Sequence, residues 1–287
     1  MKLVRYGPVG SEKPGLIDGS GELRDLSKAL DDIDGPSLAP ESLGRLGALD
    51  PSSLPTVSGD PRLGVPLSGI GKIVGVGLNY ADHAAESGMP IPDEPILFAK
   101  QITALNGPND PVMIPRDGVA VDWEAELAVV IGSLARYVTE DDALGHVAGY
   151  CVANDVSERV FQLKRGGDWQ KGKSCDTFAP LGPWLVTADE VGDPQDLRVR
   201  LELNGETMQD GSTAKMIFGV AHLISYISAF MTLMPGDVII TGTPPGVGAG
   251  RKPPRFLVPG DVMTLGVEGL GEQRQALIAY NNTNPNH

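Results

Sequence analysis

The sequence predicts a mainly β protein with some α-helix, in which most strands pair antiparallel. Apolar runs with the alternation of strands outnumber those with helical spacing. The 37 glycines and 24 prolines are spread along the 287 residues, as expected for many turns between short strands. Strands and helices do not alternate regularly, which argues against a parallel sheet covered by helices on both faces.

Residues 1–65 are predicted to form a small β-rich N-terminal domain and a linker. Residues 2–6 have the composition of a strand, and residues 15–23 predict a hairpin that turns at Asp18 and Gly19. Residues 34–66 are rich in Pro, Ser, Gly and Leu and show little periodicity. We therefore expect them to connect the small domain to a larger body.

The larger domain is predicted over residues 66–287. An apolar run that begins at Ile73 predicts its first strand, and residues 82–88 predict a short helical turn that ends at Gly88. Residues 197–203 alternate and run into Asn204-Gly205, a strong hairpin signal.

The best helical pattern covers residues 214–234. Apolar side chains recur there at spacings of three and four residues, and Pro235-Gly236 ends the pattern. The sequence therefore predicts one long helix in the second half of the chain.

Composition and charge limit the class of protein. The formal net charge of −14 argues against nucleic-acid and membrane-surface partners, because both are anionic. No run approaches 18 apolar residues, and the N-terminus lacks a signal-peptide core. The two cysteines, Cys151 and Cys175, are too few for a disulfide framework and indicate a cytoplasmic protein with reduced thiols.

Glu124 and Glu126 are the most informative residues. They lie in an apolar run, residues 121–131, that predicts a buried strand, and side chains two apart on a strand share a face. Two neighbouring carboxylates repel each other unless a cation intervenes, and carboxylate oxygens suit Mg²⁺, Mn²⁺ or Ca²⁺. Asp155 ends another apolar run and supplies a third ligand. The alternative is a solvated face of a surface strand.

A cluster of basic residues occupies residues 159–173 of this acidic chain. Part of it, residues 167–174, matches a phosphate-binding loop, but a polar run precedes it and two prolines follow, so nucleotide binding is not predicted. Local cations would offset metal-binding carboxylates and attract an anionic substrate. Lys173 is the first candidate; a solvated loop is the alternative.

His83 and Glu86 are three residues apart on the predicted helical turn, so their side chains are neighbours. A carboxylate bonded to an imidazole suits a general base that activates water. The alternative is a surface turn with an incidental histidine. Residues 241–248 supply hydroxyls and free backbone N–H groups, which fit either a carboxylate-binding turn or a simple tight loop.

Together these segments resemble the fumarylacetoacetate hydrolase family over roughly residues 70–280. The matching segments, in order, are residues 77–86 (GLNYADHAAE), 122–127 (DWEAEL), 154–159 (NDVSER), 171–178 (KGKSCDTF) and 241–246 (TGTPPG). The resemblance implies a mixed β-sandwich roll, usually assembled as a homodimer. Many relatives carry Ser where this chain has Thr103, which retains a hydroxyl and affects only substrate details.

The resemblance also assigns roles to residues. It implies that Mg²⁺ or Mn²⁺ is held by Glu124, Glu126 and Asp155. It implies that Lys173 stabilises the substrate enolate and that His83 and Glu86 activate water on a lid. The residues implied to hold the substrate are Arg159, Gln162 and Thr243.

Residues 169–178 and 242–254 look most like bacterial 2,4-diketo-3-deoxy sugar-acid hydrolases, which act on rhamnose- or fucose-derived acids. The expected activity is hydrolysis of a carbon–carbon bond in a 2,4-dioxo acid such as 2,4-diketo-3-deoxy-L-rhamnonate or -L-fuconate. The products would be pyruvate and a hydroxy acid such as lactate. Acylpyruvate hydrolase, oxaloacetate decarboxylase and a non-catalytic metal-binding module are the alternatives.

Overall fold

The computed structural model describes residues 1–88 and 90–280. The last seven residues of the predicted larger domain, 281–287, lie outside this range. The helices are α1 (Pro40–Gly47), α2 (Ala81–Ser87), α3 (Glu140–Ala143), α4 (Arg159–Lys164), α5 (Gln170–Lys173) and α6 (Val220–Phe230). The strands are β1 (Lys2–Tyr6), β2 (Lys13–Ile17), β3 (Leu23–Asp25), β4 (Ile73–Gly77), β5 (Ile96–Lys100), β6 (Leu105–Asn106), β7 (Val112–Met113), β8 (Val121–Asp122), β9 (Ala125–Ile131), β10 (Val147–Asn154), β11 (Ser157–Glu158), β12 (Ala179–Thr187), β13 (Arg198–Leu203), β14 (Glu206–Ser212), β15 (Val238–Ile240), β16 (Val262–Val267) and β17 (Gly271–Ile278).

A large sheet organises the molecule. Its strand order is β3-β2-β1-β12-β10-β9-β15-β4-β5, with β6 paired to β12 off this path. Most neighbouring strands in it are antiparallel, whereas β15–β4 and β12–β6 are parallel. Every residue of β9 is buried, because this strand lies in the middle of the sheet. The prediction of a mainly β protein with some α-helix is therefore confirmed.

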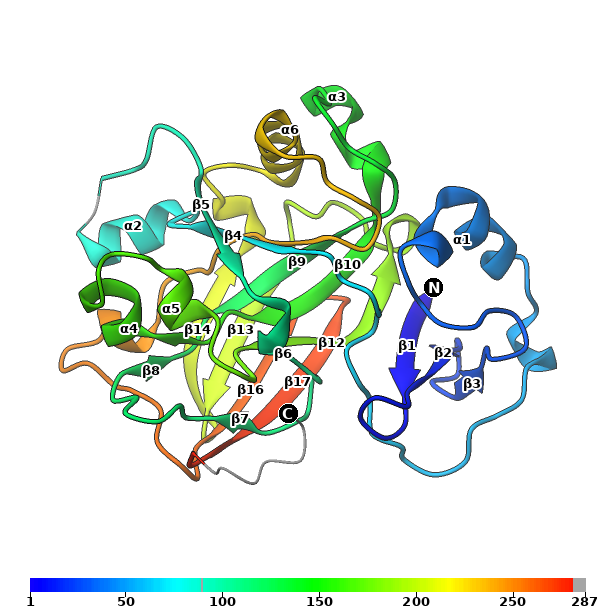
Figure 1. Ribbon diagram of the computed structural model, residues 1–287, viewed down its shortest axis with the longest axis horizontal. Coiled ribbons are helices and arrows are strands. Elements are labelled where there is room, and N and C mark those ends of the chain that lie inside the picture. Colours follow the sequence, from blue (N-terminus) through cyan, green and yellow to red (C-terminus); the bar gives the residue numbers. More distant parts are fainter. Residues whose placement is uncertain (89, 281–287) are drawn as a thin grey trace.

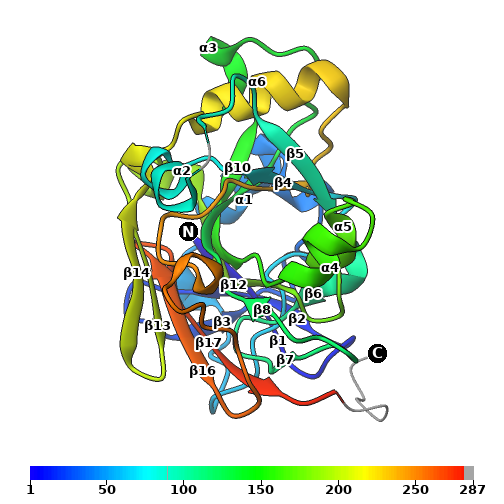
Figure 2. The same cartoon turned by 90° about the vertical axis from the view of Figure 1, so that its left-hand side faces the viewer.

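A second sheet packs on the first. Its order is β14-β13-β16-β17-β7, and β16 and β17 contact β10 and β12 of the large sheet. In Figure 2 the second sheet lies on one side of the body, α4 and α5 lie on the opposite side, and α3 and α6 lie at one end. The core between these layers is aliphatic, and Leu127, Leu185, Leu201 and Leu265 are fully buried or nearly so.

Several expected turns form for the predicted reasons. β13 and β14 join at Asn204-Gly205, where both residues have positive φ. The expected hairpin of β2 and β3 also forms, but its loop covers residues 18–22 and the residue with positive φ is Gly21 rather than Gly19. The helical turn of α2 ends at Gly88 with φ +64°, a left-handed cap that glycine adopts without strain.

The strand expected over residues 121–131 is interrupted. β8 ends at Asp122 and pairs with β11, whereas β9 begins at Ala125 and pairs with β10. Between them, the Glu124 N–H donates to the Asn154 side chain at 3.3 Å. The Ala125 N–H donates to the Gln209 side chain at 3.0 Å. At Glu124 and Ala125, side-chain acceptors therefore take the place of the backbone acceptors that a continuous strand would provide.

The helix expected over residues 214–234 is shorter than predicted. Helix α6 covers Val220–Phe230, because tertiary bonds hold the flanking residues in other conformations. On the N-terminal side, the Phe218 N–H donates to the side-chain oxygen Oδ1 of Asn79 at 2.8 Å. On the C-terminal side, Leu233 and Ala135 exchange two backbone hydrogen bonds of 2.9 Å.

The N-terminal segment is joined to the larger body through the sheet. Strand β1 pairs antiparallel with β12, so the hydrogen bonding crosses the predicted domain boundary near residue 65 (Figure 1). Arg62 adds an ion pair across this boundary to Asp110 at 2.6 Å, and it also pairs with Glu12 of its own segment at 2.9 Å. The division into residues 1–65 and 66–287 stays a prediction. Among the described residues, no helix is long and apolar enough to cross a membrane.

Candidate metal and active site

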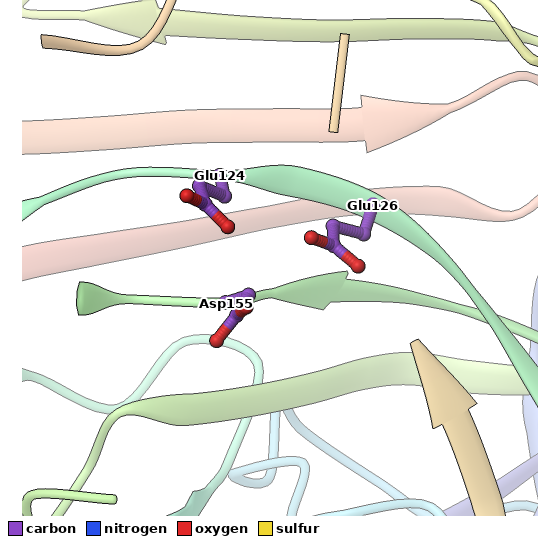
Figure 3. Close-up of side chains that lie close together, drawn as sticks. All are labelled: Glu124, Glu126 and Asp155. Atoms are coloured by element: carbon purple, nitrogen blue, oxygen red, sulfur yellow. The ribbon is translucent and has the colours of Figure 1, made fainter. Parts of the chain in front are cut away.

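Three buried carboxylates come together where β9 and β10 meet. One oxygen atom of each of Glu124, Glu126 and Asp155 lies within 4.8 Å of the others. Figure 3 shows Glu124 and Glu126 on one segment of chain and Asp155 on the neighbouring segment. Register explains the cluster, because Ala125 pairs with Asn154 and the Asp155 N–H donates to the Glu124 carbonyl oxygen at 2.9 Å.

Buried cations accompany two of the three carboxylates. Lys173 Nζ lies 2.7 Å from Glu124 and 2.5 Å from Asp155. Lys100, which the sequence analysis did not select, pairs with the other oxygen of Asp155 and donates to the Val156 carbonyl oxygen at 3.1 Å. Arg159 lies 2.7 Å from Glu124.

Glu126 is left without such a partner. None of the ion pairs in the described part of the chain includes Glu126, whose carboxylate accepts the Gly242 N–H at 2.8 Å. Burial, with the charges of Asp155 and Glu124, raises the pKa of Glu126 well above its usual value. Burial acts in the same direction on Glu124, but Lys173 and Arg159 outweigh it and hold the pKa of Glu124 well below its usual value.

The donor set fits a divalent cation. Three carboxylate oxygens at this spacing are the hard ligands that Mg²⁺ and Mn²⁺ prefer. Because Glu126 has no cationic side-chain partner in the described part of the chain, a bound divalent cation would supply the positive charge that favours its ionised form. Glu124, Glu126 and Asp155 are therefore the residues that could hold a metal.

A cavity of about 860 Å³ opens beside this cluster and brings most of the predicted site residues together. His83 Nδ1 lies 3.2 Å from Glu86 Oε2, and the same oxygen accepts the Gly246 N–H at 3.1 Å. Helix α2 is thus tied to the loop after β15. The predicted site residues that line the cavity are His83, Glu86, Glu124, Glu126, Arg159, Gln162, Lys173 and Thr243.

The predicted substrate-holding residues differ in what they still offer. Arg159 donates to the Gln162 side chain at 3.2 Å, and both line the cavity. Thr243 also lines it, but its hydroxyl donates to the Ala125 carbonyl oxygen at 2.9 Å and accepts from Gln209 at 2.7 Å. The Thr243 hydroxyl therefore has no second proton for a substrate and offers only a lone pair.

Lys173 is charged in this setting. Burial opposes its charge, but Asp155 and Glu124 outweigh burial and raise the pKa of Lys173 above its usual value. Its Nζ also lies 4.9 Å from the ring centroid of Phe98, a cation–π contact. Phe98 and Trp169, with ring centroids 5.7 Å apart, form the aromatic wall of the cavity.

The match to a phosphate-binding loop and two further histidines do not indicate additional sites. Residues 167–174 follow helix α4 rather than a strand and contain only the four-residue helix α5, so they do not form a phosphate-binding loop. His146 bonds Ser133 at 2.9 Å and His222 bonds Glu140 at 2.8 Å, both away from the carboxylate cluster.

Comparison with known proteins bears on the whole chain. Residues 72–278 match the profile of the fumarylacetoacetate (FAA) hydrolase C-terminal domain. A Burkholderia lata protein that carries only a general hydrolase name is 58% identical over 276 residues, which are 96% of this chain and 98% of that protein.

Solved structures agree over nearly the full length. A fumarylacetoacetate hydrolase from Exiguobacterium antarcticum matches with a TM-score of 0.87 and 36% identity, over 98% of this chain and 100% of that chain. Maleylpyruvate hydrolase from Sphingobium sp. SYK-6, in complex with manganese(II) and pyruvate, matches with a TM-score of 0.82, 30% identity and the same coverage, 98% and 100%. A 2-hydroxyhepta-2,4-diene-1,7-dioate isomerase from Mycobacterium marinum matches with a TM-score of 0.75 and 33% identity, over 98% and 100%. The fold expected from the sequence is confirmed.

Proposed function

Because the chain belongs to the fumarylacetoacetate hydrolase family, we propose that it is a metal-dependent hydrolase acting on a carbon–carbon bond of a 2,4-dioxo acid. The observation that carries this proposal is the meeting of two groups in one cavity. The carboxylates of Glu124 and Glu126 line the same space as the His83–Glu86 pair. The similar maleylpyruvate hydrolase holds manganese(II) and pyruvate, a metal and a product of the expected kind.

The residues divide the chemistry. Glu124, Glu126 and Asp155 would hold Mg²⁺ or Mn²⁺, which would supply Lewis-acid chemistry toward the oxygen atoms of the substrate. His83 Nδ1 is engaged by Glu86, which leaves Nε2 to take a proton from water. The water oxygen bonds to C4, the C3–C4 bond breaks, and its electron pair passes to the pyruvate enolate. Lys173 offsets that charge, and C3 then takes a proton.

The substrate follows from the segments that resemble sugar-acid hydrolases. We propose 2,4-diketo-3-deoxy-L-rhamnonate or -L-fuconate, cleaved to pyruvate and a hydroxy acid such as lactate. Simple acylpyruvates are the competing substrates. Turnover of a panel of 2,4-dioxo acids with Mg²⁺ and Mn²⁺ tests the proposal, and a panel in which only acylpyruvates react would replace the sugar acids. A protein that binds the metal but converts no substrate in the panel would instead be a non-catalytic module.

Two substitutions test the mechanism on whichever substrate reacts. Glu126→Ala should abolish metal-dependent turnover, because it removes a ligand that no other side chain replaces. His83→Ala should lower kcat by at least about 100-fold, the usual share of general base catalysis. Retained metal-dependent turnover in Glu126→Ala would remove the metal assignment.

Oxaloacetate decarboxylation is a second candidate, favoured by one observation. Lys173 is bonded to Glu124 and Asp155 without the help of His83, so enolate stabilisation does not depend on the water-activating pair. Release of carbon dioxide that survives His83→Ala, while hydrolysis is lost, would assign both reactions to one centre.

The assembly and the location belong to the same proposal. We propose a homodimer, as the family resemblance implies, and a cytoplasmic location, as the two free cysteines indicate. Sedimentation velocity of the full chain measures the assembly directly, and a single species of 30.2 kDa would overturn the dimer.

A further inference from the structure

Asp122 is a fully buried carboxylate that does not belong to the cluster of Glu124, Glu126 and Asp155. Its Oδ1 accepts the N–H groups of Trp123 at 2.9 Å and Gly248 at 2.6 Å. Its Oδ2 accepts the N–H of Ala249 at 3.0 Å and both Nε and Nη2 of Arg159, at 2.9 and 2.8 Å. Both oxygens are therefore saturated by donors from three separate segments.

The groups that Asp122 bonds lead to two parts of the proposed active site, the carboxylate cluster and the His83–Glu86 pair. On one side, Arg159 also contacts Glu124 at 2.7 Å and the Gln162 side chain at 3.2 Å. On the other side, the loop bonded by Asp122 continues back to Gly246, whose N–H donates to Glu86 at 3.1 Å. Only Val247 separates Gly246 from Gly248.

The loop lies directly against the carboxylate. A Cβ atom at position 248 would lie 2.7 Å from Asp122 Oδ1 and 1.9 Å from the Arg255 carbonyl oxygen, so only glycine fits. A Cβ atom at Gly250 would lie 3.0 Å from Glu86 Cδ. The backbone of this loop, rather than its side chains, therefore transmits the position of Asp122 to Glu86.

We infer that Asp122 is a positioning residue that fixes Arg159 and the loop of residues 246–249 to each other. It thereby holds the His83–Glu86 pair and the substrate-binding arginine in one geometry. The roles of His83, Glu86 and Arg159 rest on the proposed function, whereas the connection through Asp122 rests on the hydrogen bonds alone. A neutral Asn side chain cannot replace it, because its NH₂ group would face a guanidinium or a backbone N–H.

The test compares Asp122→Asn with Asp110→Asn in the full-length protein. Asp110 is a matched control, since it accepts from Arg62 at 2.6 Å and from the Gly107 N–H at 3.2 Å, outside the cavity. Hydrogen exchange followed by mass spectrometry should show faster exchange in residues 246–250 and in α2 for Asp122→Asn only. Unchanged exchange in residues 246–250 would overturn the inference, whatever the protein catalyses.

Kinetics with acetopyruvate and Mn²⁺ separate positioning from general destabilisation. Asp122→Asn should raise KM, through Arg159, and lower kcat, through Glu86, with a combined loss of about 10- to 100-fold. Loss of folded protein alone would lower kcat at constant KM. In the Asp122→Asn background, Glu86→Gln should cost less than in the native protein by at least about twofold, the lower end of coupling within one network. If Glu86→Gln lowers kcat/KM by the same factor in both backgrounds, the inference would be overturned.

The role of Asp122 can still be tested if Asp122→Asn does not fold or if the native protein does not convert acetopyruvate. Where Asp122→Asn does not fold, Arg159→Lys opens the same connection from its other end, because a lysine cannot bridge Asp122 and Glu124 as the planar fork does. It should likewise speed exchange in residues 246–250. Where the native protein does not convert acetopyruvate, the proposed activity fails for that substrate, and hydrogen exchange alone decides the role of Asp122.

Discussion

At the scale of single residues, the site is a balance of buried charge. The carboxylates of Glu124 and Asp155 are paired with Lys100, Lys173 and Arg159, whereas Glu126 has no cationic partner among the described residues. All six side chains are buried or largely so. Removing one member of a buried pair leaves a charge that water cannot reach. The cations therefore keep the cluster folded before any metal binds, and each of them also opposes the binding of a divalent cation.

Lys100→Met tests this balance. Burial outweighs Asp155 and lowers the pKa of Lys100, and Lys173 still contacts Asp155. We therefore expect the free energy of unfolding without metal to fall by less than about 3 kcal/mol, the lower end for a broken buried pair. Mn²⁺ should stabilise the variant more than the native protein, since it restores the missing positive charge. Urea unfolding with EDTA and with Mn²⁺ measures both effects.

Lys72→Met is the matched control. Lys72 also pairs with a buried aspartate, Asp237, but these residues directly precede β4 and β15 and lie outside the carboxylate cluster. Its loss should lower stability equally with and without Mn²⁺. Equal stabilisation of the native protein and Lys100→Met by Mn²⁺ would contradict the charge balance.

The Cys175 thiol gives a pH-dependent prediction. Burial raises the pKa of Cys175 to about 11, and the thiolate is the form that reacts. A thiol deprotonates as pH rises, so alkylation by iodoacetamide should be slow at pH 8 and speed up about tenfold per pH unit toward pH 11. Mass spectrometry of the alkylated peptide measures the rate, and a rate that levels off near pH 8.5 would contradict the prediction. Cys151, which is fully buried, should not react in the folded protein.

The sequence predicted the residues that carry chemistry better than those that hold them. Glu124, Glu126 and Asp155 were recognisable because carboxylates in apolar runs are unusual. Lys100 and Asp122 gave weaker signals, although Lys100 directly follows the apolar residues 96–99 and Asp122 adjoins Glu124 in the same motif. Lys100 bonds to Asp155, 55 residues away along the chain, and Asp122 bonds to Arg159, 37 residues away. Only the fold shows that these residues are in contact.

At the scale of elements, the pairing of β9 with β10 creates the cluster, and β4 shapes the wall beside it. Gly77 ends β4 beneath the Trp169 ring, where a Cβ atom would lie 2.6 Å from the ring. The strand can therefore carry the aromatic wall only if this residue has no side chain.

Gly77→Ala should push Trp169 toward the cavity. We expect the free energy of unfolding to fall by about 1–3 kcal/mol, the usual cost of overpacking. Urea unfolding measures this loss, and Trp169→Leu in the same chain should recover part of it. Gly44→Ala in α1 is the control, because nothing lies within 4 Å of that Cβ position. It should stabilise the protein by about 0.5–1 kcal/mol, as alanine does in a helix. Equal losses in both variants would contradict the proposed contact.

Element boundaries were predicted where local chemistry decides them. The Asn204-Gly205 turn and the Gly88 cap depend on residues that accept positive φ, which the sequence displays directly. The break before β9 and the ends of α6 depend instead on bonds from Gln209, Asn154, and Asn79. Side chains that are distant in sequence override the helix or strand that local periodicity predicts, and the local sequence does not reveal these contacts.

At the scale of the whole molecule, the N-terminal segment completes the large sheet. Strand β1 covers one edge of β12, and the fully buried side chains of Leu3, Leu26 and Leu38 belong to the continuous core. The sequence predicted a small N-terminal domain and a linker over residues 1–65, because residues 34–66 look like a connector, and this division stays a prediction. Sequence composition does not reveal that the first strand pairs with a partner more than 170 residues later.

Removal of residues 1–65 follows from this architecture. The fragment of residues 66–287 would expose the β12 edge, which can pair with another chain, and would lose the leucines that β1 to α1 contribute. We expect the fragment to unfold at a lower temperature than the full chain and to aggregate, as measured by calorimetry and sedimentation velocity. Full-length Arg62→Ala tests the side-chain contacts separately from the strand pairing. It removes the ion pairs with Glu12 and Asp110 and the hydrogen bond to the Gly7 carbonyl oxygen, leaves β1 paired with β12, and should cost about 1 kcal/mol. A fragment as stable and as monodisperse as the full chain would instead establish residues 66–287 as an independent domain. The sheet would then tolerate an open edge at β12, and β1 would act as a detachable cover rather than as part of the folding unit.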